Sequence, residues 1–173
     1  MEKKVLLIVN PVAGLGNIKK DINKIINNFE NLGYETETEF TTIEKNGESI
    51  VQEKVNDGEI VVAVGGDGTL NEVVNGVLKN GKKVKMGFIP LGTTNDFAKT
   101  LNIPTDKFLF SKEINNTIEK TCDIGKFNDK YFNYVSAFGV FAKTSFSTQR
   151  KFKNKFGRLA YFGQRNKGFY RRR

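Results

Sequence analysis

Hydrophobic positions in roughly the first hundred residues follow two patterns that alternate along the chain. Short apolar runs, and one run that alternates with Glu as an edge strand does, predict strands at 5–9, 60–64, 85–89 and 34–40. Apolar residues at helical spacing predict helices at 18–32, 48–56, 70–78, 95–101 and 106–120. Strands that alternate with helices favour right-handed crossovers. The pattern therefore predicts an α/β fold of three layers, an open and mostly parallel sheet with helices on both faces.

The pattern changes at about residue 122. Nine of the fifteen Phe and four of the five Tyr lie from Phe127 onward, and residues 123–139 have the alternation of a hairpin. A helix-like stretch follows at about Ser147 to Gln164. A hairpin and one helix seldom form a stable unit alone. We therefore expect residues 1–122 to form the α/β domain and residues 123–173 to begin a second domain.

Positive charge gathers at the end of the chain. The net charge is +9, and the segment from Arg150 to Arg173 carries ten Lys or Arg and no Asp or Glu. Such a block favours an anionic partner, a membrane surface or nucleic acid, although a solvated helix face has the same composition. We do not expect nucleic acid, because stacking on bases needs exposed aromatics and these aromatics fit the core of the second domain. Free strand edges and uncovered aromatics also predict a homo-oligomer.

Composition excludes several classes of protein. No apolar run approaches the ~20 residues that span a bilayer, and the run at 5–9 is shorter than the apolar part of a signal peptide. We therefore expect a cytoplasmic protein, at most peripheral on the inner face of the membrane. Cys122 is the single cysteine, and the absence of His excludes Ser-His-Asp catalysis and zinc sites built on His. Any general base must be Asp, Glu, Lys or Tyr.

The segment after the apolar run 60–64 carries the clearest chemical signal. It has the sequence Gly65-Gly66-Asp67-Gly68-Thr69-Leu70-Asn71-Glu72 and opens a helical pattern. Glycines let the backbone approach a ligand closely, and the free N–H groups of a helix's first turn attract phosphate. The side chains of Asp67, Asn71 and Glu72 can bind a metal, a ribose hydroxyl or a proton. The segment therefore indicates nucleotide chemistry.

Two further loops also follow a predicted strand and precede a predicted helix. Their sequences are Asn10-Pro11-Val12-Ala13-Gly14-Leu15-Gly16-Asn17 and Pro90-Leu91-Gly92-Thr93-Thr94-Asn95-Asp96-Phe97-Ala98. Each has a simpler interpretation, since the first can merely turn the chain and Thr94 or Asn95 can cap the next helix. The carboxyl ends of parallel strands meet at one edge of a sheet, where open α/β folds bind ligands. We therefore expect the three loops to converge on a nucleotide.

These three segments resemble the catalytic domain of the diacylglycerol kinase family, which includes bacterial lipid kinases related to diacylglycerol, sphingosine and ceramide kinases. The glycine-aspartate-glycine core also occurs in NAD kinases and phosphofructokinases. The Asn-Pro opening and the run from Gly92 to Ala98 favour the lipid kinases. The resemblance covers about residues 5–165. It implies an NAD kinase-like or diacylglycerol kinase-like α/β domain followed by the start of an all-β sandwich.

The resemblance also implies an activity, transfer of the γ-phosphoryl of ATP to the hydroxyl of a lipid such as diacylglycerol, with Mg2+. It places Thr41 or Thr42 and also Thr93 beside the nucleotide, and Asp67 nearest the transferred phosphate as the candidate catalytic base. The residues implied to bind ATP are Asn10, Pro11, Val12, Ala13, Gly14, Thr41, Gly65, Gly66, Asp67, Gly68, Thr69, Leu70, Asn71, Glu72 and Thr93. No metal ligand is assigned in this chain. In the bacterial branch, acidic residues late in the second domain hold a structural magnesium and supply the base.

The chain has no counterpart of those late acidic residues. We therefore expect a fragment, a truncated product or a degenerate copy of such a kinase, which binds ATP weakly and phosphorylates lipid poorly. The basic segment 150–173 would hold the cleft near anionic lipid. Three alternatives stay open: a non-catalytic nucleotide-binding fragment that docks on a partner or membrane, an NAD kinase-like enzyme, and an RNA- or DNA-binding protein.

Overall fold

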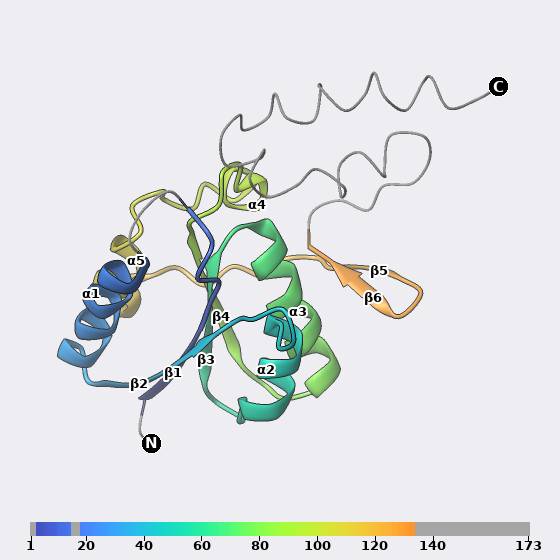
Figure 1. Cartoon of the computed structure of the whole chain (residues 1–173), viewed down its shortest axis with the longest axis horizontal. Coiled ribbons are helices and arrows are strands. Elements are labelled where there is room, and N and C mark those ends of the chain that lie inside the picture. The colour runs from blue at the N-terminus through green and yellow to red at the C-terminus, as the bar shows by residue number, and fades with distance from the viewer. Residues whose placement is uncertain (1–2, 15–17, 134–173) are drawn as a thin grey trace. The chain divides into compact units, whose positions relative to one another are not determined.

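A four-stranded parallel sheet forms the centre of the structure (Figure 1). In this computed structural model residues 3–14 and 18–133 are described. The strands are β1 (Lys3–Val9), β2 (Tyr34–Phe40), β3 (Ile60–Gly65) and β4 (Lys85–Pro90), in the order β2-β1-β3-β4. All four predicted strands are confirmed, and β2 lies at an edge as its alternation with Glu predicts.

The helices also follow the predicted order. They are α1 (Ile18–Asn31), α2 (Gly47–Lys54), α3 (Asp67–Asn80), α4 (Asp96–Thr100) and α5 (Leu109–Glu113), followed by a 3₁₀ turn η1 (Ile114–Asn116). α3 begins three residues before the predicted start at Leu70, so the run from Asp67 onward is already helical.

The helix predicted at 106–120 is wrong in its extent, because α5 ends at Glu113. The side chains that follow compete with a helix for backbone groups. The Thr117 hydroxyl donates to the Ile114 carbonyl at 2.8 Å, and the Asn115 amide oxygen accepts from the Tyr34 hydroxyl at 2.9 Å. These contacts turn the chain away after one 3₁₀ turn.

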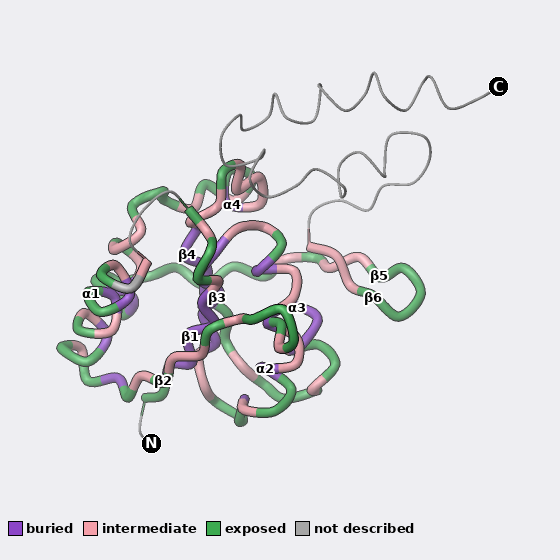
Figure 2. The backbone as a smooth tube through the Cα atoms, in the orientation of Figure 1, coloured by how far each residue is buried: buried purple, intermediate pink, exposed green. Residues whose placement is uncertain are grey.

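The core consists of two layers, one on each face of the sheet. Successive residues of β1 point to opposite faces, so Leu7 packs with Ile25 of α1, whereas Ile8 packs with Val73 of α3. All four of these side chains are fully buried, and Figure 2 shows that buried positions gather on β1 and β3. The three-layer α/β arrangement predicted from the sequence is confirmed.

The chain turns in opposite directions from the two central strands. β1 leads through α1 to β2 on one side, whereas β3 leads through α3 to β4 on the other. The loops at the carboxyl ends of β1 and β3 therefore flank a topological switch point. Ligands of open α/β sheets bind in the crevice outside the strand ends at such a point.

A short hairpin follows the α/β layers, with strands β5 (Gly125–Phe127) and β6 (Lys130–Phe132). Its turn contains Asn128 at a φ of 51°. The side-chain amide of Asn75 in α3 donates to the Tyr131 carbonyl at 2.8 Å and accepts from the Tyr131 N–H at 3.0 Å. These two bonds attach the hairpin to α3.

The part of the predicted second region beyond residue 133 lies outside the described residues, including the rest of the predicted hairpin and the basic segment 150–173. The described residues all lie in one compact unit. The domain boundary expected between residues 122 and 123 stays a prediction. Within the described part of the chain, the helices are all too short or too polar to cross a membrane.

Candidate functional site

The loops after β1, β3 and β4 meet at one edge of the sheet, as the sequence predicts. Gly14 in the first loop has a φ of 77°, and a Cβ placed on it would lie 3.1 Å from the Leu91 carbonyl oxygen of the third. The second and third loops approach more closely still, because a Cβ on Gly92 would lie 2.6 Å from the Gly66 Cα. Backbone contact of this kind is possible only where side chains are absent.

The loop after β1 is held in place by Asn10. Its backbone N–H donates to the Val64 carbonyl at 3.0 Å, and its side-chain oxygen accepts from the Val12 N–H at 3.1 Å. Its side-chain nitrogen donates to the Thr69 hydroxyl of α3 at 3.1 Å. Pro11, Val12 and Gly14 are exposed on this fixed loop.

The N-terminus of α3 lies between the loops. Its N-cap is Gly66, which has no side chain to cap the helix, and the first intrahelical bond runs from the Leu70 N–H to the Gly66 carbonyl. The preceding N–H groups of Asp67, Gly68 and Thr69 have no acceptor within the helix. Gly68 is exposed with open space around its Cα. This turn therefore offers backbone donors and the positive end of a helix dipole to an anion.

Gly65 and Leu70 support this turn from within. A Cβ on Gly65 would collide with the Thr69 side chain, which is only 3 % exposed. The Leu70 side chain is equally buried and packs in the core. Both residues were predicted to contact ATP, and the structure places them beneath the loop surface.

Asp67 contacts the loop after β4. Its two carboxylate oxygens accept from the backbone N–H groups of Asp96 at 3.0 Å and of Phe97 at 3.1 Å. These are the first two residues of α4. A cap by Thr94 or Asn95 was the simpler interpretation of this loop, but the N-cap residue Asn95 makes no side-chain cap bond. A carboxylate from another helix fulfils that role.

Glu72 makes a similar contact on the other side of α3. Its carboxylate accepts from the N–H of Gly47, the first residue of α2, at 3.0 Å. A Cβ on Gly47 would lie 3.2 Å from the Glu72 Cβ, so the two helices touch here. Asp67, Thr69 and Glu72 thus bond to the segments that follow β4, β1 and β2, and we call these three residues the α3 hub.

The threonines predicted to reach the nucleotide differ in their surroundings. The Thr41 N–H donates to the Val9 carbonyl at 2.9 Å, which places Thr41 beside the end of β1. The Thr42 hydroxyl accepts from the Lys45 N–H at 3.0 Å and closes the next turn. Thr93 is exposed in the third loop. The structure therefore brings Thr41, rather than Thr42, to the loop cluster.

Some participants in the site were not predicted. Gly92 permits the contact with Gly66, and Asn95 adopts a left-handed φ of 48° while its side chain donates to the Gly92 carbonyl at 2.8 Å. The sequence feature that could have indicated these two roles is a glycine and an asparagine in a loop between a strand and a helix. Their spacing alone did not indicate the contact partners.

The described residues contain no group of three or more acidic, Cys or His side chains that could hold a metal ion. Asp67 and Glu72 already accept backbone hydrogen bonds. The side-chain oxygen of Asn71 is buried without a partner among the described residues. Proteins usually bind Mg2+ through one or two side-chain oxygens together with the phosphates of the substrate. The described residues fit a magnesium ion held in this way, chiefly by the phosphates of a bound ligand.

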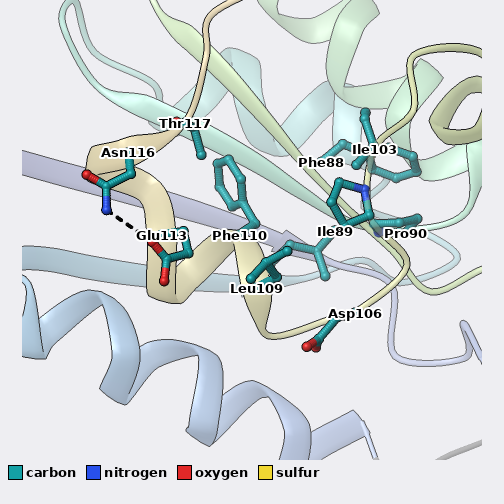
Figure 3. Close-up of a pocket in the computed structure, with 11 residues that line it drawn as sticks. Phe88, Ile89, Pro90, Ile103, Asp106, Leu109, Phe110, Glu113, Asn116 and Thr117 are labelled. Atoms are coloured by element: carbon teal, nitrogen blue, oxygen red, sulfur yellow. Dashed lines mark hydrogen bonds between the residues drawn. The ribbon is translucent and has the colours of Figure 1, made fainter.

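A separate cavity lies beside β4 (Figure 3). Its volume is about 270 Å³, and its walls are mainly apolar side chains such as Phe88, Ile89, Leu109 and Phe110. None of the residues that line it is Lys or Arg. The lining therefore carries no positively charged side chain and includes the carboxylates of Asp106 and Glu113, which disfavour a phosphate.

The fold and the loop cluster together define an open α/β protein whose loops meet the uncapped N-terminus of α3 at its topological switch point. The family described as "Diacylglycerol kinase catalytic domain" matches residues 4–127, and the chain belongs to this family.

Known proteins resemble the chain in sequence and in structure. It is 35% identical to "Diacylglycerol kinase" of Bacillus subtilis (strain 168) over 162 residues, which are 92% of this chain and 54% of the relative. It is 36% identical to "Diacylglycerol kinase" of Staphylococcus carnosus (strain TM300) over 165 residues, 94% of this chain and 53% of the relative. A crystal structure titled as a diacylglycerol kinase from Bacillus anthracis str. Sterne superimposes with a TM-score of 0.66 at 32% identity, covering 75% of this chain and 45% of that one. The chain thus spans about half the length of the curated relatives that it matches.

Proposed function

We propose that this chain supplies the nucleotide-binding part of an ATP-dependent lipid kinase. The oxygen of a lipid hydroxyl, such as that of diacylglycerol, attacks the γ-phosphorus of ATP. The bond to the bridging oxygen of ADP then breaks, and the hydroxyl proton passes to a base. Family membership supports the reaction. The observation that carries the proposal is the convergence of three loops on the uncapped N-terminus of α3.

The proposal assigns phosphate binding to backbone groups. The N–H groups at the start of α3 face an anion, and the loop from Asn10 to Gly14 forms the neighbouring wall. Thr41 and Thr93 stand on the flanks, at the ends of β2 and β4. Phosphoryl transfer depends mostly on positioning and charge neutralisation, which backbone donors at a helix N-terminus provide.

Magnesium, when bound, would neutralise charge on the transferred phosphoryl group. The described residues suit a metal held chiefly by the nucleotide, with the unpartnered Asn71 oxygen as a candidate contact. Asp67 remains the candidate base that the resemblance implies. Each of its oxygens accepts one backbone N–H and keeps a second lone pair, so these bonds do not test that role.

A lipid substrate requires a membrane surface, and the ten Lys and Arg of residues 150–173 suit an anionic one. We propose peripheral binding to the inner face of the membrane. Replacing Lys151, Lys153, Lys155 and Arg158 with Gln should reduce sedimentation with vesicles of acidic phospholipid. Unchanged sedimentation would remove this part of the proposal.

Two measurements test the kinase function. Differential scanning calorimetry should give a higher Tm with Mg-ATP than without it, because a ligand that binds only the folded state stabilises that state. Transfer of label from [γ-32P]ATP to diacylglycerol in mixed micelles tests the reaction itself. Binding without transfer would restrict the chain to a nucleotide-binding fragment, and transfer to NAD instead would identify an NAD kinase-like enzyme.

A further inference from the structure

The third loop is attached to three consecutive residues where β3 ends and α3 begins, Gly65, Gly66 and Asp67. The Leu91 N–H donates to the Gly65 carbonyl at 2.7 Å, and Gly92 packs against Gly66. The N-terminus of α4 then bonds to the carboxylate of Asp67. Among these three attachments only that of Asp67 uses a side chain. Asp67 is therefore the attachment that a substitution can break without altering the backbone contacts.

α4 depends on this carboxylate. The helix has only five residues, and its N-cap Asn95 has a left-handed φ of 48° and no side-chain cap bond. Asp67 reaches across 29 and 30 positions of sequence to accept from the first two N–H groups of the helix. A carboxylate also stabilises the positive end of the helix dipole. Without Asp67, these two N–H groups would lose the carboxylate oxygens to which they donate.

Loss of the contact between Asp67 and α4 would affect Thr93. This residue is exposed between Gly92, which is packed on Gly66, and Asn95, whose side chain donates to the Gly92 carbonyl. The loop is thus fixed at Gly92 on one side and at α4 on the other. If the α4 attachment is lost, Thr93 keeps only one of its two supports.

We propose that Asp67 is a positioning residue, which acts on the bound nucleotide through α4 and the loop that carries Thr93. This inference rests on the proposed function. It assigns to Asp67 a role that needs neither proton transfer nor metal binding, because the role uses only the two hydrogen bonds to the start of α4.

Asp67→Asn tests the inference, because Asn has the same shape but only one accepting oxygen. We expect faster hydrogen exchange at the amides of Asp96 and Phe97, and a Kd for ATP about tenfold higher, equal to one lost charge-assisted hydrogen bond. The increase should be the same with and without Mg2+. Asp67→Glu keeps both acceptors and should recover part of the affinity. It also serves as the second variant if Asp67→Asn does not fold.

The matched control is Asp57→Asn. The Asp57 carboxylate likewise accepts a backbone N–H, that of Lys83 at 2.8 Å, but it lies at the opposite edge of the sheet, before β3 and β4. Its substitution should leave the Kd for ATP unchanged. Thr93→Ala should weaken binding in the native chain and have little further effect beside Asp67→Asn, since coupled residues are not additive.

Three outcomes would overturn the inference: unchanged exchange at Asp96 and Phe97, a loss of affinity seen only with Mg2+, or additive effects of Asp67→Asn and Thr93→Ala. A loss seen only with Mg2+ would mean that Asp67 acts through the metal, and additive effects would mean that Asp67 acts independently of Thr93. If the native chain binds no ATP at all, the proposed function fails. The exchange rates at Asp96 and Phe97 then decide by themselves whether Asp67 holds the loop.

Discussion

The two edges of the sheet use glycine for different reasons. At the amino edge, where chains enter β3 and β4, Gly58 and Gly81 have φ values of 82° and 75° and open space where a Cβ would lie. At the carboxyl edge, Gly65 and Gly66 have no left-handed φ but are crowded by Thr69 and Gly92. The two amino-edge glycines therefore turn the chain, whereas Gly65 and Gly66 let backbones touch. Gly14 at the carboxyl edge does both, with a φ of 77° and a Cβ position 3.1 Å from the Leu91 carbonyl oxygen. Close backbone approach marks the edge that we propose as functional.

The polar side chains of the two edges differ in how many segments they join. At the amino edge, Glu59 accepts from the Asn56 N–H of its own turn at 2.9 Å, and Asp57 accepts from the Lys83 N–H, 26 positions away, at 2.8 Å. The α3 hub bonds to three separate segments, each 25 or more positions away, which contain Asn10, Gly47 and Asp96. The hub therefore makes the geometry of one loop depend on the others.

Gly65→Ala should have the largest effect, because the new methyl group collides with the buried side chain of Thr69. We expect a loss of about 3 kcal/mol in the free energy of unfolding, typical of severe overpacking, and loss of the ATP-dependent rise in Tm. Urea denaturation measures the first effect.

Gly58→Ala is the matched change at the amino edge. The added Cβ would lie in open space, so the substitution strains only the left-handed backbone at Gly58 and should lower the free energy of unfolding by about 1 kcal/mol. The rise in Tm with ATP should stay unchanged. Equal losses of ATP response in the two variants would remove the distinction between the edges.

Asn10→Ala should have the next largest effect on stability and ATP binding, since it removes the hydrogen bonds to the Thr69 hydroxyl and to the Val12 N–H. About 1–2 kcal/mol of stability should be lost, with a higher Kd for ATP measured by calorimetry. Asn56→Ala, which breaks the exposed bond to Glu59, should cost less than about 1 kcal/mol and not alter the Kd. A stronger effect of Asn56→Ala on ATP binding would contradict the comparison.

Glu72→Gln should have a smaller effect, because the amide oxygen of Gln can still accept from the Gly47 N–H while the negative charge at the start of α2 is lost. We expect a loss of about 0.5–1 kcal/mol, measured by urea denaturation. Glu59→Gln, at the exposed turn of the amino edge, is the control and should change stability by less. Equal losses of stability in Glu72→Gln and Glu59→Gln would show that the position of Glu72 in the α3 hub makes its hydrogen bond no more important than that of Glu59.

We expect the smallest effect from the salt bridges that join α2 to α3 and to the hairpin. The hydrogen bond from Lys79, at 2.7 Å, holds the pKa of Glu48 below its usual value, with a further contribution from Lys130 of the hairpin. This contribution to stability is present above the unfolded-state pKa of about 4.3 and is lost as the pH falls through the lower folded-state pKa. We expect less than about 1 kcal/mol, because the lysines are partly exposed. Acid titration of native protein and Glu48→Gln should differ only in this range, and parallel curves would contradict the assignment.

Much of the fold was predictable because it depends on local patterns. The apolar run at 60–64 can only be a buried strand, and the spacing of Ile22, Ile25 and Phe29 can only bury one helix face. The predicted helix at 106–120 was too long because periodicity does not register the Asn and Thr side chains that bond to Tyr34 and to the Ile114 carbonyl.

The sequence by itself determined the order of strands and helices, the meeting of three loops at one sheet edge and the family resemblance, because these follow from short-range periodicity and from the geometry of parallel strands. Only the tertiary structure decided what the polar residues of the glycine-rich turn do. Asp67, Asn71 and Glu72 have the same ligand-binding chemistry in the sequence. Asp67 and Glu72 differ from Asn71 in that a distant backbone N–H lies within hydrogen-bond distance of their carboxylates. That proximity arises when separate strands pack into one sheet, and residue spacing along the chain does not contain it.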